Sequence, residues 1–170
     1  MSVVTKTGDE GTTWAGVRLP KDSDPVEFLG DLDELNSWIG LLAVHPMIPS
    51  ILYRDWDHIQ DAIMRASAGY CQRRDWKDSH DEAQWLEDRV KAMEAELPEL
   101  RNFILPRFPA EVHVARAVCR RVERRAAGLH RLNGMPPGIM IWLNRLSDYL
   151  FTLARWVCDR LNRPERIWAT

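Results

Sequence analysis

The sequence lacks the features that would mark a secreted or membrane-spanning protein. Its three cysteines, Cys71, Cys119 and Cys158, are odd in number and form no CxxC pair, so we expect buried free thiols in a reducing compartment. No signal peptide opens the chain, and no apolar run approaches the ~18 residues of a membrane span. These absences predict a cytoplasmic protein that does not enter a membrane.

Lysine is also scarce, at only four of the 23 basic residues. Because arginine binds carboxylate and phosphate in a planar, bidentate way, its excess favours an anion site. Residues 1–100 carry 10 basic and 20 acidic side chains, whereas residues 101–170 carry 13 and 5. Such asymmetry could serve nucleic-acid binding. The arginines lie within apolar helical patterns, however, so packing between the halves or between subunits is the better interpretation.

No stretch shows the alternation of a β-strand, but five stretches repeat apolar residues at steps of three and four. We expect helices at about 26–44, 50–73, 81–98, 109–132 and 139–161. Ser79 and Glu82 have the spacing of a capping box at the start of the third helix. Five helices with one apolar stripe each predict an all-α helical bundle over residues 26–162, within a single domain of residues 1–170.

The stretch 103–125 organises the rest of the chain. Pro109 suits the first turn of a helix, and the helix that follows has one apolar stripe. Its members are Val112, Ala115, Cys119, Val122, Ala126 and Leu129. Beside the stripe, Arg116, Arg120 and Arg124 fall four residues apart, next to Arg121 and Arg125. Guanidinium groups one turn apart repel unless an anion lies among them. A solvated basic face and an anion site with carboxylate or phosphate partners both remain open.

Residues 2–25 are rich in glycine, proline and threonine, which is typical of a loop. Within residues 5–13, two glycines let backbone N–H groups approach an anion, while four threonines and Lys6 supply donors. No GxxxxGK[ST] motif is present. A phosphate-binding loop and a polar tail are therefore the two alternatives.

Three further features have more than one interpretation. Asp33 belongs either to a solvated helix start or, if buried, to a pair with the fourth-helix arginines. His113 has neither a second histidine nor an acid four residues away, so we expect packing or hydrogen bonding and not metal ligation. The eight tryptophans are expected in the core and at interfaces.

Five motifs occur in order along nearly the whole chain. They are residues 5–13 (TKTGDEGTT), 30–37 (GDLDELNS), 100–106 (LRNFILP), 115–124 (ARAVCRRVER) and 143–151 (LNRLSDYLF). Together they resemble the ATP:cob(I)alamin adenosyltransferase family of the propanediol-utilisation type. The resemblance implies a five-helix bundle that assembles as a homotrimer with sites between subunits. It also implies a reaction that moves the 5′-deoxyadenosyl group of ATP to cobalt and leaves triphosphate.

The resemblance further implies roles for particular residues. Those expected to bind ATP are Thr5, Lys6, Thr7, Gly8, Thr12, Thr13, Lys21, Arg116, Arg120, Arg121, Glu123 and Asn144, the first seven of them in an ATP-binding loop within residues 1–25. Asp33 would pair with Arg116, and Phe103 would face the corrin, so these three are the expected catalytic residues. ATP, Mg²⁺ held mainly by the ATP phosphates, and cobalamin would be the ligands. A reductase and an adenosylcobalamin-dependent enzyme would be partners, without nucleic acid or membrane.

The sequence departs from the family pattern at three places. Arg107-Phe108 follows Ile-Leu-Pro where Gly-Gly is usual, residues 14–18 stand where a Gly-Gly pair is common, and Pro25 precedes Val26-Glu27 where an arginine is usual. Phe108 is therefore an alternative corrin-facing residue. An active adenosyltransferase is the first interpretation. The alternative is a non-catalytic relative that binds ATP, corrinoid or both as a carrier, sensor or scaffold.

Overall fold

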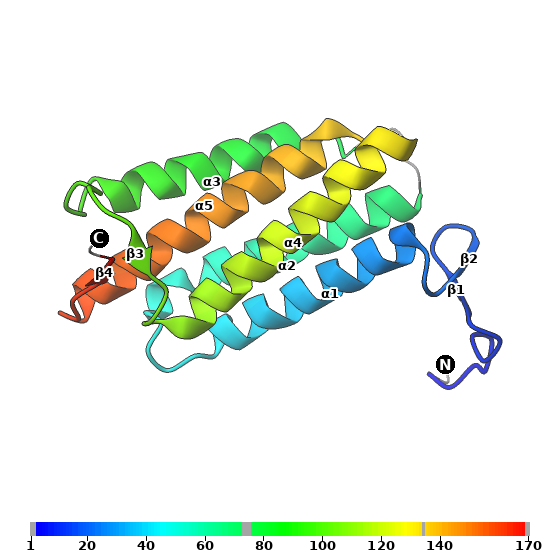
Figure 1. The fold of residues 1–170 in the computed structure, drawn as a ribbon, viewed down its shortest axis with the longest axis horizontal. Coiled ribbons are helices and arrows are strands. Elements are labelled where there is room, and N and C mark those ends of the chain that lie inside the picture. Colours follow the sequence, from blue (N-terminus) through cyan, green and yellow to red (C-terminus); the bar gives the residue numbers. More distant parts are fainter. Residues whose placement is uncertain (1–2, 73–75, 134, 169–170) are drawn as a thin grey trace.

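Five long helices lie side by side in the computed structural model, which describes residues 3–72, 76–133 and 135–168 (Figure 1). They are α1 (Asp24–Ala43), α2 (Tyr53–Cys71), α3 (Ser79–Glu94), α4 (Ala110–Asn133) and α5 (Pro137–Arg160). The predicted all-α five-helix fold is confirmed. No helix of the described residues is both long enough and apolar enough to cross a bilayer.

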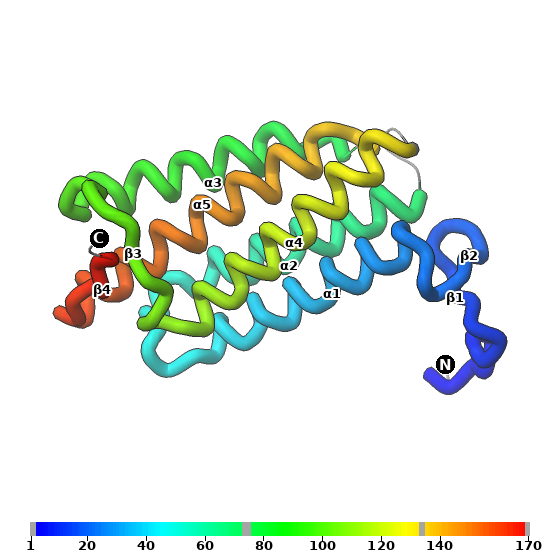
Figure 2. The backbone as a smooth tube through the Cα atoms, in the orientation of Figure 1, coloured from blue at the N-terminus to red at the C-terminus, as the bar shows by residue number. Residues whose placement is uncertain are grey.

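The helices pack through the apolar stripes that the sequence indicated. α4 packs against α1 and α5, α5 packs against α3, and α1 packs against α2, an arrangement that can be followed along the tube in Figure 2. Every residue of the α4 stripe is buried. The three cysteines are free thiols, two of them buried and Cys71 half-buried. A continuous apolar core therefore stabilises the bundle.

Two helices contain in their first turn a proline that the sequence analysis had left outside the helix. α1 begins at Asp24 with Pro25 in its first turn, and α5 begins at Pro137. Proline fits there because the first-turn N–H groups have no partner within the helix. A short 3₁₀ turn, η1 (Ser50–Leu52), precedes α2. The predicted end of the second helix, Arg73, lies outside the described residues.

The predicted capping box at α3 is wrong. Ser79 is already the first residue of the helix, Asp78 is the N-cap, and no side chain caps the helix by a hydrogen bond. The Glu82 carboxylate instead contacts α2, where it accepts hydrogen bonds from His58 at 2.7 Å and Arg65 at 2.6 Å. Glu82 therefore forms an ion pair with Arg65 of α2 instead of the capping contact with Ser79 that the spacing indicated.

The described residues include four short strands that the sequence analysis did not predict, because two or three residues are too few to show alternation. β1 (Thr12–Trp14) pairs antiparallel with β2 (Arg18–Pro20), and β3 (Ile104–Leu105) pairs antiparallel with β4 (Arg166–Ile167). Figure 1 shows the first pair beyond the start of α1 and the second at the opposite end of the bundle. The amino-terminal loop and the carboxyl-terminal segment therefore lie at opposite ends of the molecule.

One buried polar cluster ties three helices together. The Asp55 side chain of α2 is only 4% exposed and accepts hydrogen bonds from Arg89 Nε of α3 at 2.9 Å and from the Tyr149 hydroxyl of α5 at 3.1 Å. Burial raises the pKa of Tyr149 well above its usual value. The phenol therefore stays protonated and donates to the buried carboxylate.

Ion pairs join α4 to α1 along one side. Arg121 pairs with Asp31, at 3.1 Å, and with Glu34, while Arg125 pairs with Glu27 and Asp31. These arginines are half-exposed, so each pair contributes modestly to stability. Carboxylates of the acidic first helix thus neutralise two of the five clustered arginines.

We expect Arg121→Gln to lower the free energy of unfolding by about 1 kcal/mol, because Asp31 and Glu34 lose a shared partner while the aliphatic stem is kept. The matched control is Arg124→Gln, an exposed position in the same helix for which the structure describes no ion pair. It should change stability by less than about 0.5 kcal/mol. Urea unfolding measures both, and equal effects would contradict the assigned pairing.

Candidate functional site

The exposed side of α4 and α5 gathers charged side chains whose partners are incomplete. Arg116, Arg120 and Glu123 project from α4, and Asn144 and Asp148 project from α5. Their spacing of three and four residues places each set on one face of its helix. The sequence analysis singled out all of these residues except Asp148, and the structure brings them together.

Asn144 is held from both sides. Its Nδ2 donates to Glu123 Oε1 at 3.0 Å, and its Oδ1 accepts from Arg145 Nη1 at 2.6 Å. Arg145 in turn pairs with Glu87 of α3 at 2.6 Å. The amide therefore has a defined orientation at the centre of the site. Arg145 and Glu87 were missed by the sequence analysis because a contact between helices leaves no trace in local spacing.

Arg116 lacks a full set of partners within the described residues. Its Nε is buried with no hydrogen-bond partner, and its guanidinium carbon lies 5.4 Å from the centre of the Phe151 ring. Burial and the neighbouring Arg120 both lower the pKa of Arg116. Since a guanidinium stays charged in proteins, this environment favours an anion beside it.

Two groups near this face, the buried Cys119 and Asp148, have pKa values that burial raises. The Cys119 thiol, which donates to the Leu143 carbonyl at 3.2 Å, has its pKa raised by burial and by Glu123. It therefore stays protonated, which excludes it as a thiolate nucleophile. The pKa of Asp148 is raised by burial, with Arg145 the largest opposing influence. The suitability of this face for an anion comes instead from the neighbouring Arg116 and Arg120 guanidinium groups.

The arginines of α4 thus divide into two sets. Arg121 and Arg125 are engaged by α1, so Arg121, which the resemblance placed among the ATP ligands, already has two carboxylate partners. Arg120 and Arg124 are exposed, and the structure describes no ion pair for either. The two interpretations of the arginine cluster, an anion site and a solvated basic face, therefore each hold in part. Carboxylates of α1 pair with Arg121 and Arg125, whereas Arg120 and Arg124 are exposed.

Several expected ATP-binding residues of the amino-terminal loop lie close to one another. Lys6 adopts a positive φ of 57°, and the Thr5 and Thr7 hydroxyl oxygens lie 3.0 Å apart. Lys21 N donates to Gly11 O at 2.9 Å. A Cβ at Gly8 would lie 3.2 Å from Lys21 Nζ. These residues therefore gather at one place, although they are up to 16 positions apart in sequence.

Two more threonines of the expected ATP loop, Thr12 and Thr13, begin strand β1 and are half-exposed. The hairpin is held against the bundle at Gly16, where φ is +81° and a Cβ would lie 1.7 Å from the Cys71 carbonyl oxygen. Only glycine fits this close approach. The hairpin therefore docks on the end of α2.

Within one chain, the loop and the arginine site lie apart. Arg125 pairs with Glu27 near the start of α1, beyond which the loop lies (Figure 1). Arg116 is nine residues earlier in α4, or roughly 14 Å of helix farther from that end. The structure thus brings the α4 and α5 residues together but leaves the predicted loop residues elsewhere.

Asp33 does not contact Arg116 within the described chain. It lies on the exposed side of α1, where its backbone carbonyl accepts a hydrogen bond from Ser37. The α1 acids that pair with α4 in the same chain are Glu27, Asp31 and Glu34. The predicted pairing of Asp33 with Arg116 therefore requires a second chain and stays a prediction.

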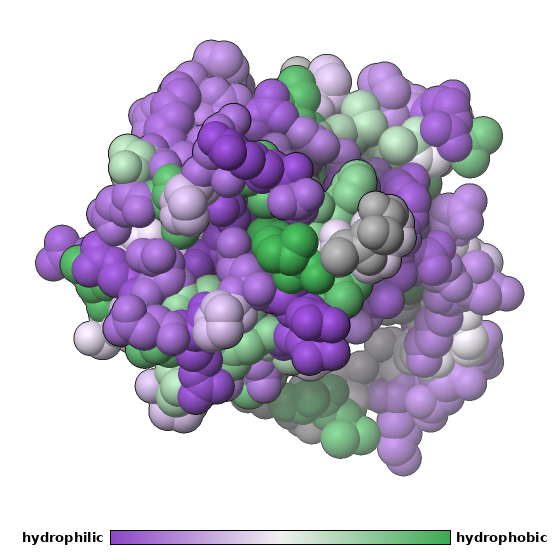
Figure 3. Space-filling view, turned by 60° about the vertical axis from the view of Figure 1, so that its left-hand side comes forward, coloured by the Kyte–Doolittle hydropathy of each residue, from purple (hydrophilic) through white to green (hydrophobic). Residues whose placement is uncertain are grey.

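The two candidate corrin-facing phenylalanines have different surroundings. Phe103 is 78% exposed, and its ring meets Trp168 edge-on with the ring centres 6.2 Å apart. Phe108 is half-buried against the core, with the Arg163 guanidinium carbon 4.4 Å from its ring centre. Figure 3, with this end of the molecule turned forward, shows a small hydrophobic area ringed by hydrophilic side chains. Phe103 is thus the one that is free to meet a large apolar ligand.

His113 is half-buried one turn before Arg116. Burial and Arg116 lower its pKa, so the imidazole is neutral at neutral pH. Among the described residues, no group of three or more His, Cys, Asp or Glu side chains could hold a metal ion.

Comparisons with known proteins agree on one family. Residues 3–157 match the family model described as cobalamin adenosyltransferase. The chain is 39% identical to the corrinoid adenosyltransferase of Bacillus subtilis (strain 168) over 171 residues, covering 94% of this chain and 88% of that protein. It is 36% identical to corrinoid adenosyltransferase MMAB of Bos taurus over 182 residues, covering 98% of this chain and 75% of the relative.

A solved structure has the same fold. It is a variant of the PduO-type ATP:corrinoid adenosyltransferase from Lactobacillus reuteri, complexed with cobalamin and ATP. The TM-score is 0.91 at 28% sequence identity, and the alignment covers 99% of this chain and 100% of that one. The sequence motifs, the five-helix bundle and these matches lead to one conclusion: the chain belongs to the cobalamin adenosyltransferase family.

Proposed function

We propose that this protein transfers the 5′-deoxyadenosyl group of ATP to cob(I)alamin, giving adenosylcobalamin and triphosphate. The observation that carries the proposal is the Arg116–Arg120 pair beside the oriented Asn144 amide. Relatives that cover most of the chain are named corrinoid adenosyltransferases, and a structural neighbour is complexed with both substrates. These findings support the same reaction for this chain.

The reaction needs charge stabilisation more than acid–base chemistry. Cobalt(I) supplies an electron pair to the 5′ carbon of ATP, the bond from that carbon to its oxygen breaks, and the pair leaves with triphosphate. Negative charge grows on the leaving oxygen, where the Arg116 and Arg120 guanidinium groups would stabilise it. Glu123 would act through Asn144, whose amide it orients at 3.0 Å. The protein then aligns the reactants and excludes water.

Mg²⁺ is best treated as part of the nucleotide substrate. We propose that it arrives bound to the ATP phosphates. Mg²⁺ commonly keeps several water molecules and binds through substrate phosphates. Thr5, Lys6, Thr7, Gly8, Thr12, Thr13 and Lys21 would then wrap the remaining phosphate and ribose oxygens.

We also propose a homotrimer whose sites lie between subunits. The separation of the loop from Arg116 within one chain supports this arrangement, because a neighbour could supply the missing half. The same boundary would let Asp33 of one chain pair with Arg116 of the next. Residues 1–25 would form the ATP loop and residues 26–162 the bundle. A reductase that supplies cob(I)alamin, an enzyme that uses the product and a cytoplasmic location stay predictions.

Anaerobic incubation with ATP, Mg²⁺, a reductant and cobalamin tests the reaction directly. We expect the spectrum of cob(I)alamin to give way to that of adenosylcobalamin, with one triphosphate released per corrinoid. Arg116→Gln should reduce turnover by roughly 100-fold or more, as loss of one charge-stabilising donor commonly does. Tight binding of both substrates without any product would favour the non-catalytic alternative.

Mixed trimers test whether the site is shared. Lys6→Ala and Arg116→Ala should each be inactive, since each removes one charged contact to the phosphates. When the two variants are co-expressed in equal amounts, we expect roughly one quarter of wild-type activity, because a site then needs an intact loop from one chain and an intact α4 from the next. Sedimentation should confirm the trimer. A mixture that is trimeric and inactive would reject the shared site.

Phe103 and Phe108 can be separated by the coordination of cobalt. The lower axial ligand donates electron density to cobalt and makes cob(II)alamin hard to reduce, so a ring on the lower face assists by excluding that ligand. We expect Phe103→Ala, at the exposed position, to lose the spectroscopic signature of four-coordinate cob(II)alamin while ATP affinity persists. Phe108→Ala should keep the signature. Retention of the full signature in Phe103→Ala would reject its role.

A further inference from the structure

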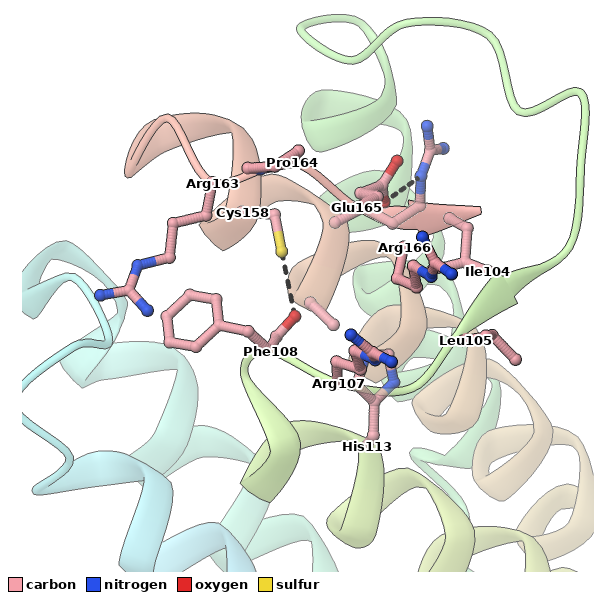
Figure 4. Close-up of a pocket in the computed structure, with 12 residues that line it drawn as sticks. Ile104, Leu105, Arg107, Phe108, His113, Cys158, Arg163, Pro164, Glu165 and Arg166 are labelled. Atoms are coloured by element: carbon pink, nitrogen blue, oxygen red, sulfur yellow. Dashed lines mark hydrogen bonds and ion pairs between the residues drawn. The ribbon is translucent and has the colours of Figure 1, made fainter. Parts of the chain in front are cut away.

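A cavity of about 580 Å³ lies at the β3–β4 end of the bundle. Its walls come from the segment before α4, the start of α4, the end of α5 and the segment that leads to β4 (Figure 4). Figure 4 shows Arg107 and Arg166 on the strand side and Arg163 beside the Phe108 ring on the other. The size suits an organic ligand.

The lining of this cavity is strongly basic. It contains four arginines and a single acid, Glu165. Glu165 is already engaged, because its Oε1 accepts a hydrogen bond from the buried Arg155 at 3.1 Å. Arg155 also donates to the Pro98 carbonyl at 2.8 Å. Arg107, Arg163 and Arg166 have no ion pair in the described structure, so the cavity keeps an excess of positive charge that favours an anionic ligand.

This cavity is built by residues in which the sequence departs from the family pattern. Arg107 and Phe108 stand where two glycines are usual, and both line the cavity. The Phe108 carbonyl accepts a hydrogen bond from the Cys158 thiol at 3.0 Å, and the Phe108 ring lies under Arg163. Phe108 is therefore a wall of the cavity, which explains why it is less exposed than Phe103.

The cavity adjoins the proposed corrin-facing residue. Phe103 immediately precedes β3, whose residues Ile104 and Leu105 line the cavity. The Phe103 carbonyl accepts a hydrogen bond from Trp168 N at 2.9 Å. This bond joins the residue before β3 to the residue after β4. His113, also in the lining, is one turn from Arg116. The basic cavity thus lies next to Phe103 and about one helical turn from Arg116.

We propose that this cavity binds the phosphodiester of the nucleotide tail of the corrinoid substrate. This inference rests on the proposed function. The lower axial base of cobalamin is tethered to the corrin ring through that phosphodiester. When Phe103 displaces the base from cobalt, the tether keeps the phosphate close to the lower face. Arg107 and Arg166, for which the described residues supply no ion-pair partner, then bind the phosphate and hold the base away from the metal.

Arg107→Gln tests the inference through the difference between two corrinoids. Cobalamin carries the phosphodiester, whereas cobinamide lacks the nucleotide and its phosphate. We expect Arg107→Gln to raise the Kd of cob(II)alamin roughly tenfold, the loss of one charge-assisted contact, and to leave the Kd of cob(II)inamide within about twofold. Arg166→Gln should have the same effect on the two Kd values. The matched control is Arg54→Gln, an exposed arginine of α2 outside the cavity, which should change neither value.

Spectral titration with ATP present measures these constants, and thermal melting checks that each variant is folded. The four-coordinate fraction of bound cob(II)alamin should also fall in Arg107→Gln. Equal changes for both corrinoids, or no change for either, would overturn the phosphate site. If Arg107→Gln instead raises the Kd of ATP and leaves the ratio of the cob(II)alamin and cob(II)inamide Kd values unchanged, the cavity binds the nucleotide and not the corrinoid tail. Each of these results leaves wild-type adenosylation intact, so the inference can fail without the proposed function.

Discussion

Carboxylates of α1 lie along one side of α4, and the rest of the site depends on which arginines they neutralise. Asp31, Glu34 and Glu27 engage Arg121 and Arg125, which join the two helices. Arg116 and Arg120 face the other way, beside α5, where the described residues supply too few anions. The same run of arginines therefore stabilises the bundle on one side and favours an anionic substrate on the other.

The length of the helices sets a second constraint. The β1–β2 hairpin and the β3–β4 pair lie at opposite ends of a bundle whose helices reach 24 residues, or roughly 36 Å. The proposed ATP loop and the proposed corrin-facing Phe103 cannot serve one reacting pair from these positions within a single chain. Assembly brings such distant parts together in the proposed function, so the oligomer would be part of the catalytic machinery.

Arg107 and Phe108, where the sequence departs from the family pattern, both line the cavity at the β3–β4 end. Phe108 lies under Arg163 and its carbonyl accepts a hydrogen bond from Cys158 of α5, whereas Phe103 is exposed beside Trp168. Arg107 and Arg166 add positive charge to the adjoining cavity, and the described residues supply no ion-pair partner for either. An apolar ring at the surface and a basic cavity next to it match the two parts of a corrinoid, its macrocycle and its charged tail.

The sequence by itself determined the five helices and their buried stripes, because helical periodicity is local and a spacing of three and four residues suffices for each. The resemblance to the family, and not spacing, predicted that Arg116, Arg120, Glu123 and Asn144 belong together. Tertiary structure alone decided which arginines α1 neutralises, that Glu82 pairs with α2 instead of capping α3, and that residues near 105 and 166 pair as strands. It also decided that Asp33 and the amino-terminal loop lie away from Arg116. These outcomes depend on the packing of distant segments, and a contact between helices leaves no periodic pattern in either one.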